Sequence, residues 1–244
     1  MSVSKKIATR ECCDLTFATY TSKTPFLTLD YALTTTTEMQ ADTVYATGGR
    51  GNPQRIPFHG SRTGTIGFTT QIVPFKLYSL LSGAAIDSTA TFIKREVLAA
   101  STDTLTLTSA PVAGTLVVYA EGDEYGDAVT TTVTGTTVTL PESSTGNFIA
   151  WYVETISSNV QKVSITSTTF PQEYTVYAET VSKTEDGEIV PYKMIAYKCS
   201  PQGIFSLSLS NSGDPMTLEF TADLLANDDG KMLDLILIEE DTSV

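Results

Sequence analysis

Strict alternation of apolar and polar residues is the feature that most constrains how this chain can fold. Near the carboxy terminus Phe205, Leu207 and Leu209 alternate with serines, and residues 104–108 alternate threonine with leucine. A period of two places every second side chain on the same face of an extended chain, so both stretches predict β-strands with one buried face. About one residue in six is threonine, a β-branched residue that suits a pleated surface. The sequence therefore predicts a mainly β protein.

Several other stretches have the alternation or the short apolar run of a strand. These predicted strands cover residues 28–33, 64–70, 116–119, 128–133, 137–140, 148–153, 163–166, 174–181, 189–198, 216–222 and 233–238. The run 233–238 is almost continuously apolar, which predicts a central strand covered on both faces. Asp229 and Gly230 predict the turn between the last two strands, which we expect to pair with each other. Residues 34–37 and 48–53 are expected to be loops.

One helix is predicted, over residues 74–83. Pro74 suits the first helical position, and Gly83 suits the position just after the last turn. The apolar residues between them keep a three-residue spacing with two flanking leucines: Phe75, Tyr78 and Leu81, beside Leu77 and Leu80. A helix of about three turns is unstable in isolation, so we expect it to cover a β-sandwich.

The chain changes character along its length. Residues 1–60 contain few self-contained elements and are interpreted as a long arm that packs against neighbouring subunits. Between 96 and 165 the predicted strands are short and are separated by Gly and Pro, as in a small β-sandwich or hairpin module, and two of these strands flank Gly135 as a hairpin. We therefore expect a discontinuous core domain, 1–95 and 166–244, with an extended N-terminal arm, interrupted by an inserted β module at 96–165.

The charge balance argues against nucleic-acid recognition. The 244 residues include 15 Lys+Arg and 28 Asp+Glu, a formal charge of −13. Such an acidic surface repels phosphate. The charge has two interpretations, simple solubility or the wall of a conduit along which DNA slides without being held.

Cysteine usage and apolar runs bear on where the chain is made. Cys12, Cys13 and Cys199 have no framework spacing, and adjacent cysteines rarely bridge each other, so we expect reduced thiols. The first fifteen residues lack the apolar run of a signal peptide, and no stretch approaches the length of a membrane span. We expect a protein that is made in a cytoplasm and does not insert into membranes.

The single histidine does not indicate catalysis. A catalytic triad built on His59 lacks its Gly-x-Ser-x-Gly elbow, and one histidine without a paired cysteine motif does not make a zinc site. Because proline and glycine surround His59, we interpret it as a turn or interface residue. Cys12 and Cys13 would lie on opposite faces of an extended segment, so they do not form a chelating pair.

A glycine-rich stretch resembles a phosphate-binding loop but fails its spacing. Residues 48–51 lead to Pro53, where such a loop requires Gly-Lys-Ser/Thr. We expect a flexible turn, with intersubunit ion pairs of Arg50, Arg55 and Arg62 as the alternative.

Two acidic stretches resemble calcium loops and also fail. In residues 225–236 the first and last liganding positions would be Leu225 and Ile236, which carry no oxygen ligand. Residues 122–127 lack the ligand spacing and are expected to be a solvated loop. We therefore predict no catalytic, cofactor-binding or metal-binding residue, no cofactor, and no enzyme activity.

Two stretches carry a resemblance to a known family. The first runs from Val44 through Gly-Gly-Arg-Gly-Asn-Pro to Ile56 and continues through residues 62–66 into the helix. The second runs over 191–241 and contains Pro-Tyr-Lys-Met-Ile-Ala-Tyr-Lys-Cys-Ser-Pro-Gln-Gly. Together they span about half of the chain, around the insert. They resemble bacteriophage tail tube (major tail) proteins.

That resemblance implies a β-sandwich or rolled barrel flanked by one helix. Six copies would close into a ring around a channel, and rings would stack into the tube that conducts the genome during ejection. The strands over 174–198 and after Gly203 would supply core and lumen surfaces, and residues 1–60 would contact the next ring. The module at 96–165 would lie outside the channel.

The resemblance also implies partners and a location. The chain would bind its own copies in hexameric rings, with tail sheath, tape measure, baseplate and tail terminator proteins as further partners. Viral DNA would pass through the lumen without specific binding, and the protein would belong to the virion tail after synthesis in the host cytoplasm. One alternative is a tube-initiator or baseplate ring protein of the same fold. Another is a non-enzymatic β-sandwich decoration or adhesion module, and a glycan hydrolase would need a convergent carboxylate pair.

Overall fold

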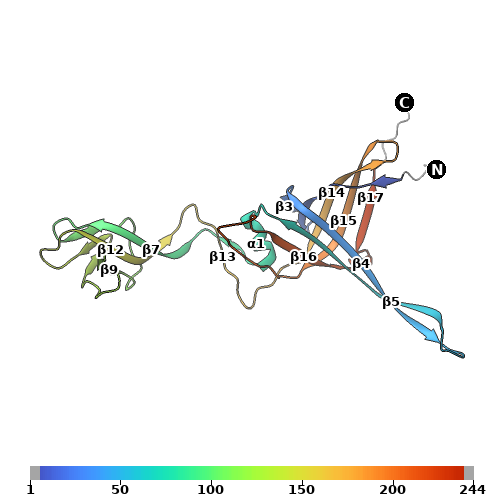
Figure 1. The fold of residues 1–244 in the computed structure, drawn as a ribbon, viewed down its shortest axis with the longest axis horizontal. Helices are drawn as coiled ribbons and strands as arrows, with labels where there is room; N and C mark the ends of the chain where they lie inside the picture. The colour runs from blue at the N-terminus through green and yellow to red at the C-terminus, as the bar shows by residue number, and fades with distance from the viewer. Residues whose placement is uncertain (1–5, 239–244) are drawn as a thin grey trace. The chain divides into compact units, whose positions relative to one another are not determined.

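The structure, a computed structural model, describes residues 6–238 and divides the chain into two compact units (Figure 1). The core unit comprises Met1–Ala85 and Ile165–Val244, and the inserted unit is Ile86–Ser164. Both units are built from antiparallel strands, and the described part of the chain contains one helix, which confirms the mainly β class. Residues 239–241, the end of the second stretch that carries the tail-tube resemblance, lie outside the described residues, as do residues 1–5 of the amino-terminal stretch.

The core unit contains a nine-stranded sheet in the order β3-β2-β14-β15-β16-β5-β4, with β1 beside β14 and β17 beside β15. Its strands are β1 (Ile7–Ala8), β2 (Asp14–Thr19), β3 (Pro25–Leu29), β4 (Ala32–Thr47), β5 (Gln54–Thr70), β14 (Tyr174–Thr184), β15 (Ile189–Pro201), β16 (Leu218–Leu225) and β17 (Leu233–Leu237). The order places amino-terminal and carboxy-terminal strands side by side, as a core interrupted by an insertion requires.

Three phenylalanines show that this sheet folds back on itself. Phe17 of β2 contacts Phe68 of β5 and Phe220 of β16, with ring centroids 6.0 and 5.4 Å away. β2 is not a neighbour of either strand in the sheet, so the two ends of the sheet face each other across this cluster. All three rings are buried, and each contributes about 1.5–3 kcal/mol of hydrophobic stabilisation. The core unit is therefore a curled β-sandwich.

The last strands pair differently from the prediction. β17 pairs with β15 through residues 192–196, and β16 pairs with the same side of β15 through residues 198–201. β16 and β17 thus follow each other along β15 and do not pair with each other, so the predicted hairpin about Asp229-Gly230 is wrong. The Asn227 carboxamide closes the turn instead, accepting hydrogen bonds from the Asp229 and Lys231 amides.

The predicted burial of the final strand is also wrong. β17 has one neighbour in the sheet, and Leu235 is 58% exposed. An apolar strand is buried on both faces only where other elements pack on both sides of it. β17 does not pair with β16, because β16 pairs with β5.

The helix is confirmed, with a different buried face. α1 (Phe75–Ser82) begins after Pro74, which is the extended N-cap residue rather than the first helical residue. It ends at Gly83 (φ 72°), whose amide donates to the Ser79 carbonyl over 2.8 Å. The side chains that enter the core are the predicted flanking leucines with one member of the stripe: Leu77, Leu80 and Leu81. Phe75 remains 38% exposed.

Residues 34–37, predicted as a loop, lie within β4. They pair with β5 in register, Thr35 with Phe68 and Thr37 with Ile66. A run of threonines lacks the apolar alternation of a half-buried strand, but β5 supplies a template of backbone donors and acceptors for it.

The inserted unit is a small β module of two three-stranded sheets and one two-stranded sheet. Its strands are β6 (Ile86–Asp87), β7 (Ala90–Ala99), β8 (Thr104–Thr106), β9 (Val117–Ala120), β10 (Thr132–Thr134), β11 (Thr137–Thr139), β12 (Asn147–Ile156) and β13 (Lys162–Val163). The sheets β7-β12-β9 and β10-β11-β8 enclose a core, and β6 pairs with β13 at the start and end of the unit. The residues of that core are Leu105, Leu107, Val118, Val138, Leu140, Phe148, Ala150 and Tyr152. The hairpin about Gly135 (φ 60°) is as predicted.

The inserted unit starts at Ile86, whereas the sequence analysis places the boundary at residue 96. Residue 96 falls inside β7, which pairs with β12 along its whole length, from Ala90 to Ala99. Strand pairing between residues distant in the sequence therefore determines which unit contains residues 86–95.

Candidate functional site

The histidine and the three cysteines come from three parts of the core unit: β5, the segment just before β2, and β15. His59 lies in β5, not in a turn as expected, and its exposed ring is 3.2 Å from the Thr43 hydroxyl. The exposed Cys12 thiol donates to the Ala32 carbonyl over 2.8 Å. Burial raises the pKa of the Cys13 thiol and raises the pKa of Cys199 to about 12, so neither is poised as a nucleophile.

The stretches that resemble ligand loops also have structural roles. Residues 225–230 include the end of β16 and the start of the turn closed by Asn227, and the 122–127 loop brings Glu124 into an ion pair with Arg95. Within residues 6–238, no group of three or more His, Cys, Asp and Glu side chains is arranged to hold a metal ion. Within the same residues, no helix is long and apolar enough to cross a membrane.

The glycine-rich stretch closes the β4–β5 hairpin. Gly49 and Gly51 have φ angles of 93° and 86°, which favour glycine. The Asn52 amide donates to the Gly49 carbonyl over 3.0 Å, and Arg55 Nε donates to the Gly48 carbonyl over 2.9 Å. The predicted turn is therefore confirmed, and its backbone polar groups are used to close the hairpin.

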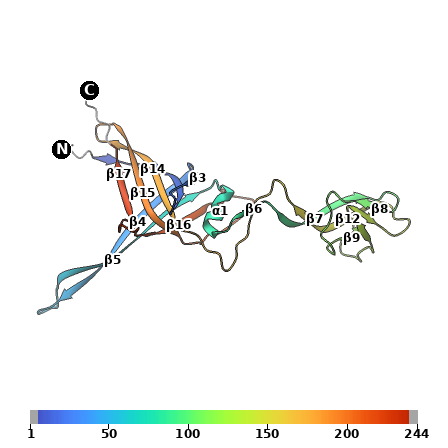
Figure 2. The same ribbon diagram turned by 180° about the vertical axis from the view of Figure 1, so that it is seen from behind.

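This hairpin extends beyond the rest of the sheet in the core unit. β4 and β5 are 16 and 17 residues long, and Figures 1 and 2 show them extending together beyond the other strands of the core unit. Residues 43–60 are called the distal hairpin below. Within residues 6–238, the two strands of the distal hairpin pair only with each other, because β16 pairs with β5 no further than Thr65.

One face of the distal hairpin is apolar and uncovered. Val44 pairs with Phe58, and Ala46 pairs with Ile56, so these side chains share a face. Val44, Phe58 and Ile56 are 69%, 59% and 56% exposed. A two-stranded hairpin alone is marginally stable in water. Such a face therefore favours burial against another surface.

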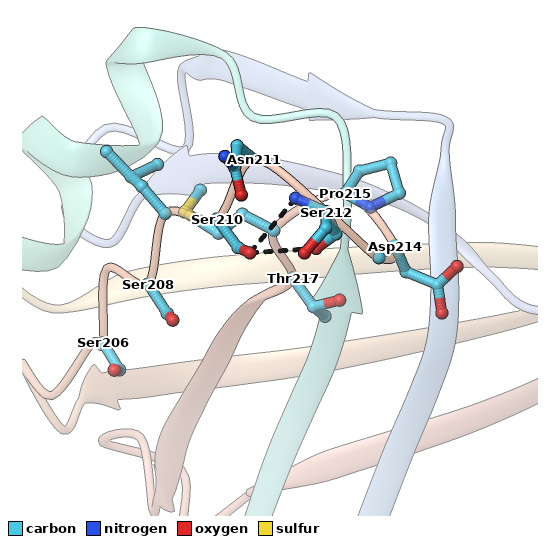
Figure 3. A pocket seen from close by; sticks show the side chains of 11 residues that line it. Ser206, Ser208, Ser210, Asn211, Ser212, Asp214, Pro215 and Thr217 are labelled. Carbon is cyan, nitrogen blue, oxygen red and sulfur yellow. Dashed lines mark hydrogen bonds between the residues drawn. The ribbon is translucent and has the colours of Figure 1, made fainter.

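A second unusual surface lies at the other end of β5. Residues 202–217, called the 202–217 segment below, follow β15 and lead into β16, and the side-chain Nε2 of Gln71 donates to the Pro215 carbonyl over 3.5 Å. Figure 3 shows serine hydroxyls of this segment lining a cavity of about 470 Å³. The cavity is formed by the segment itself, and among the described residues Asp214 is the only charged one that lines it.

The strand predicted around Phe205, Leu207 and Leu209 does not form. Gly203 has φ 66°, and there the chain, having left the end of β15, turns away from β16 and toward α1, where Phe205 packs on the Tyr78 ring at 5.8 Å. Leu207 and Leu209 are left 56% and 80% exposed. The alternation is that of a strand, but the chain leaves the sheet before this stretch can pair.

The distal hairpin was not predicted from the sequence. The signal was present, because Val44 and Ala46 occupy alternate positions before the glycine-rich turn, and Ile56 and Phe58 do so after it, on either side of Pro57. Two short alternating stretches around a glycine turn indicate a hairpin. The interpretation of residues 1–60 as an arm that packs against neighbouring subunits is wrong for β2 and β3, because Leu15, Phe17 and Leu29 are buried in the core of this chain.

Comparison with known proteins identifies the family of this chain. The model of the YomU/Tube protein family matches residues 9–238, which is nearly the whole chain and includes both units. A search among curated proteins found no match. The match supports the resemblance to phage tail tube proteins, and this chain belongs to the YomU/Tube protein family.

Proposed function

We propose that this chain is a self-assembling subunit of a phage tail tube, closing into hexameric rings that stack into the conduit for genome ejection. The family is one of phage tube structural proteins, so the chain is a structural component of the virion tail. Ring closure, stacking, and passage of DNA through the lumen are the proposed steps.

The observation that carries the proposal is the uncovered apolar face of the distal hairpin. Val44, Ile56 and Phe58 expose more than half of their side chains on a two-stranded ribbon. Burial of apolar area stabilises by roughly 25 cal/mol per Å², so docking of this face against another copy is favourable. Pairing of strand edges within closed assemblies also protects a Thr- and Val-rich sheet from uncontrolled aggregation.

The charge of −13 supports the proposed conduit. A channel formed from such subunits repels phosphate at short range, so DNA would move through it without specific contacts. Tail sheath, tape measure, baseplate and tail terminator proteins are the proposed further partners of the assembled tube.

The test is assembly of the purified full-length chain, followed by sedimentation and negative-stain electron microscopy across a range of concentrations. Wild-type protein is expected to form tubes. The double variant Val44→Thr with Phe58→Thr keeps β-forming residues but removes the apolar face, and is expected to remain unassembled with an unchanged circular dichroism spectrum. His59→Thr changes the opposite face of the same strand and serves as the matched control.

Two results would overturn the proposal. The first is wild-type protein that stays a monodisperse monomer at high concentration. The second is assembly by the Val44→Thr, Phe58→Thr variant at the wild-type concentration. Single rings that never lengthen would replace the tube assignment with a ring-initiator role.

A further inference from the structure

The distal hairpin has a charge complementary to that of the 202–217 segment together with the adjoining β16. The distal hairpin, residues 43–60, contains Arg50 and Arg55 and no Asp or Glu, in a chain whose net charge is −13. Residues 202–223 contain Asp214, Glu219 and Asp223 and no Lys or Arg. Opposite charges on two exposed surfaces favour their association and set its orientation.

The two surfaces also have complementary apolar groups. The distal hairpin exposes Val44, Ile56 and Phe58, as described above. On the 202–217 segment, Ile204 and Leu209 are 74% and 80% exposed. Each surface therefore has apolar side chains that would lose contact with water on docking, with charged groups nearby.

Next to the segment, part of a strand edge is open. β16 pairs with β15 only from Ala222 to Leu225, and the last contact toward the segment is the Gln202 amide donating to the Thr221 carbonyl over 3.0 Å. Beyond it, a cavity of about 310 Å³ is lined by Ile204, Phe205 and Ser206 of the segment and by Thr217 and Glu219. An open strand edge beside a groove accepts an added β-strand through backbone hydrogen bonds.

The geometry of β5 excludes docking within one chain. The distal hairpin lies at the Gln54 end of this strand, whereas Thr70, at the other end, pairs with Leu218 next to the segment. Seventeen residues of extended strand span roughly 50 Å. A donor and an acceptor at opposite ends of one rigid strand meet only between different copies, which gives a head-to-tail contact that repeats indefinitely.

We propose that the distal β4–β5 hairpin of one copy docks on the 202–217 segment and the adjoining β16 edge of the next copy. This inference rests on the proposed function, and it identifies the surface that receives the hairpin. Arg50 meets Asp214 and Glu219, and the apolar face of the hairpin covers Ile204, Leu207 and Leu209. The contact supplies the longitudinal step of the assembly.

Charge reversal tests the pairing. Arg50→Glu, and separately Asp214→Lys with Glu219→Lys, are each expected to raise the concentration needed for polymer formation at least tenfold. The side chains changed are exposed, so folding is retained, as circular dichroism and thermal unfolding will verify. Glu142→Lys in the inserted unit reverses an exposed acid away from both surfaces and should polymerise like wild type.

Restoration is the decisive readout. One chain that carries all three substitutions places the introduced glutamate of each hairpin against the two introduced lysines of the next copy, and a mixture of the two defective proteins also allows this contact. Both are expected to polymerise at a concentration within threefold of that needed by the wild type. A second measurement uses Leu207→Ser with Leu209→Ser, which should weaken assembly without any change in charge.

The outcomes separate this inference from the proposed function. Self-assembly through the distal hairpin stands if the wild type polymerises and the Val44→Thr, Phe58→Thr variant does not. The receiving surface is nevertheless overturned if the combined charge reversals restore no polymer and the Leu207→Ser, Leu209→Ser variant assembles normally. If Glu142→Lys is as defective as the Asp214 and Glu219 variant, net charge rather than this contact controls assembly, which also overturns it. If the wild type itself never polymerises, the proposed function fails.

Discussion

Phe17 of β2 and Phe220 of β16 meet edge to face with ring centroids 5.4 Å apart, although their strands are not neighbours in the sheet. This contact joins the two faces of the curled sheet at its centre. It also links the segment before the inserted unit to the segment after it. The core unit therefore depends on both parts of the chain for its stability.

Truncation of this contact should destabilise the core unit. Phe220→Ala removes a ring that is 1% exposed and stacks on Phe68 at 4.9 Å. We expect the free energy of unfolding to fall by about 3–5 kcal/mol, measured by denaturant titration below the assembly concentration. Phe170→Ala, at a side chain 74% exposed in the same unit, should change it by less than about 0.5 kcal/mol. Equal losses in the two variants would contradict this packing.

The helix end at Gly83 should be intolerant of a side chain. A Cβ at Gly83 would lie 2.1 Å from the Phe170 carbonyl oxygen, in addition to the strain of φ +72°. At Gly230, φ is +77° and no atom lies within 4 Å of an added Cβ. Gly230→Ala is therefore expected to cost about 1–2 kcal/mol from backbone strain, and Gly83→Ala clearly more. Thermal unfolding of the two variants checks the order, and a smaller loss at Gly83 would show that the Phe170 segment moves aside freely.

The inserted unit should lose stability in acid through Glu96 and Glu154. Burial alone would raise the pKa of Glu96, but hydrogen bonds from Thr108 and Lys94 outweigh it and lower this pKa below 4.5. Hydrogen bonds from Ser109 and Lys94 lower the pKa of Glu154 as well.

Because the folded-state pKa values are depressed, these two groups stabilise the folded unit fully above about pH 4.5, and their contribution is lost as the pH falls through the lowered values. Glu96→Gln should flatten the dependence of the melting temperature on pH between about 5 and 3, whereas Glu142→Gln should not. Parallel pH profiles for wild type and Glu96→Gln would contradict the assignment.

The three thiols should react at different rates. Cys12 is exposed, Cys13 is buried, and burial raises the pKa of Cys199 to about 12. Titration of the folded protein with a thiol-specific chromogenic reagent at pH 8 is expected to label Cys12 first, and Cys199 only after denaturation. A Cys12→Ser variant should lose the fast phase. Rapid labelling of Cys199 in the folded protein would show that β15 opens locally.

Local sequence patterns correctly predicted the elements whose conformation is determined by neighbouring residues. Pro74 and Gly83 delimit α1 because a fixed φ and a left-handed φ act within one or two residues. The hairpin about Gly135 formed as predicted for the same reason. The family resemblance likewise rested on short motifs and was borne out by the match over residues 9–238.

Predictions failed where a distant strand determined the outcome. Residues 34–37 are part of β4 because β5 pairs with them. The strand predicted at Phe205 does not form because the chain turns away from β16 at Gly203. The same cause moved the boundary of the inserted unit to Ile86, since β12 pairs with all of β7.

The sequence by itself determined the mainly β class, the single helix, and the family to which the chain belongs. Periodicity, turn residues and short motifs carry this information, and each is a property of neighbouring residues. Only the tertiary structure decided that the β4–β5 hairpin is left with an uncovered apolar face and that the 202–217 segment leaves the sheet. Both features depend on which strand edges meet, and strand pairing joins residues whose proximity no local pattern encodes.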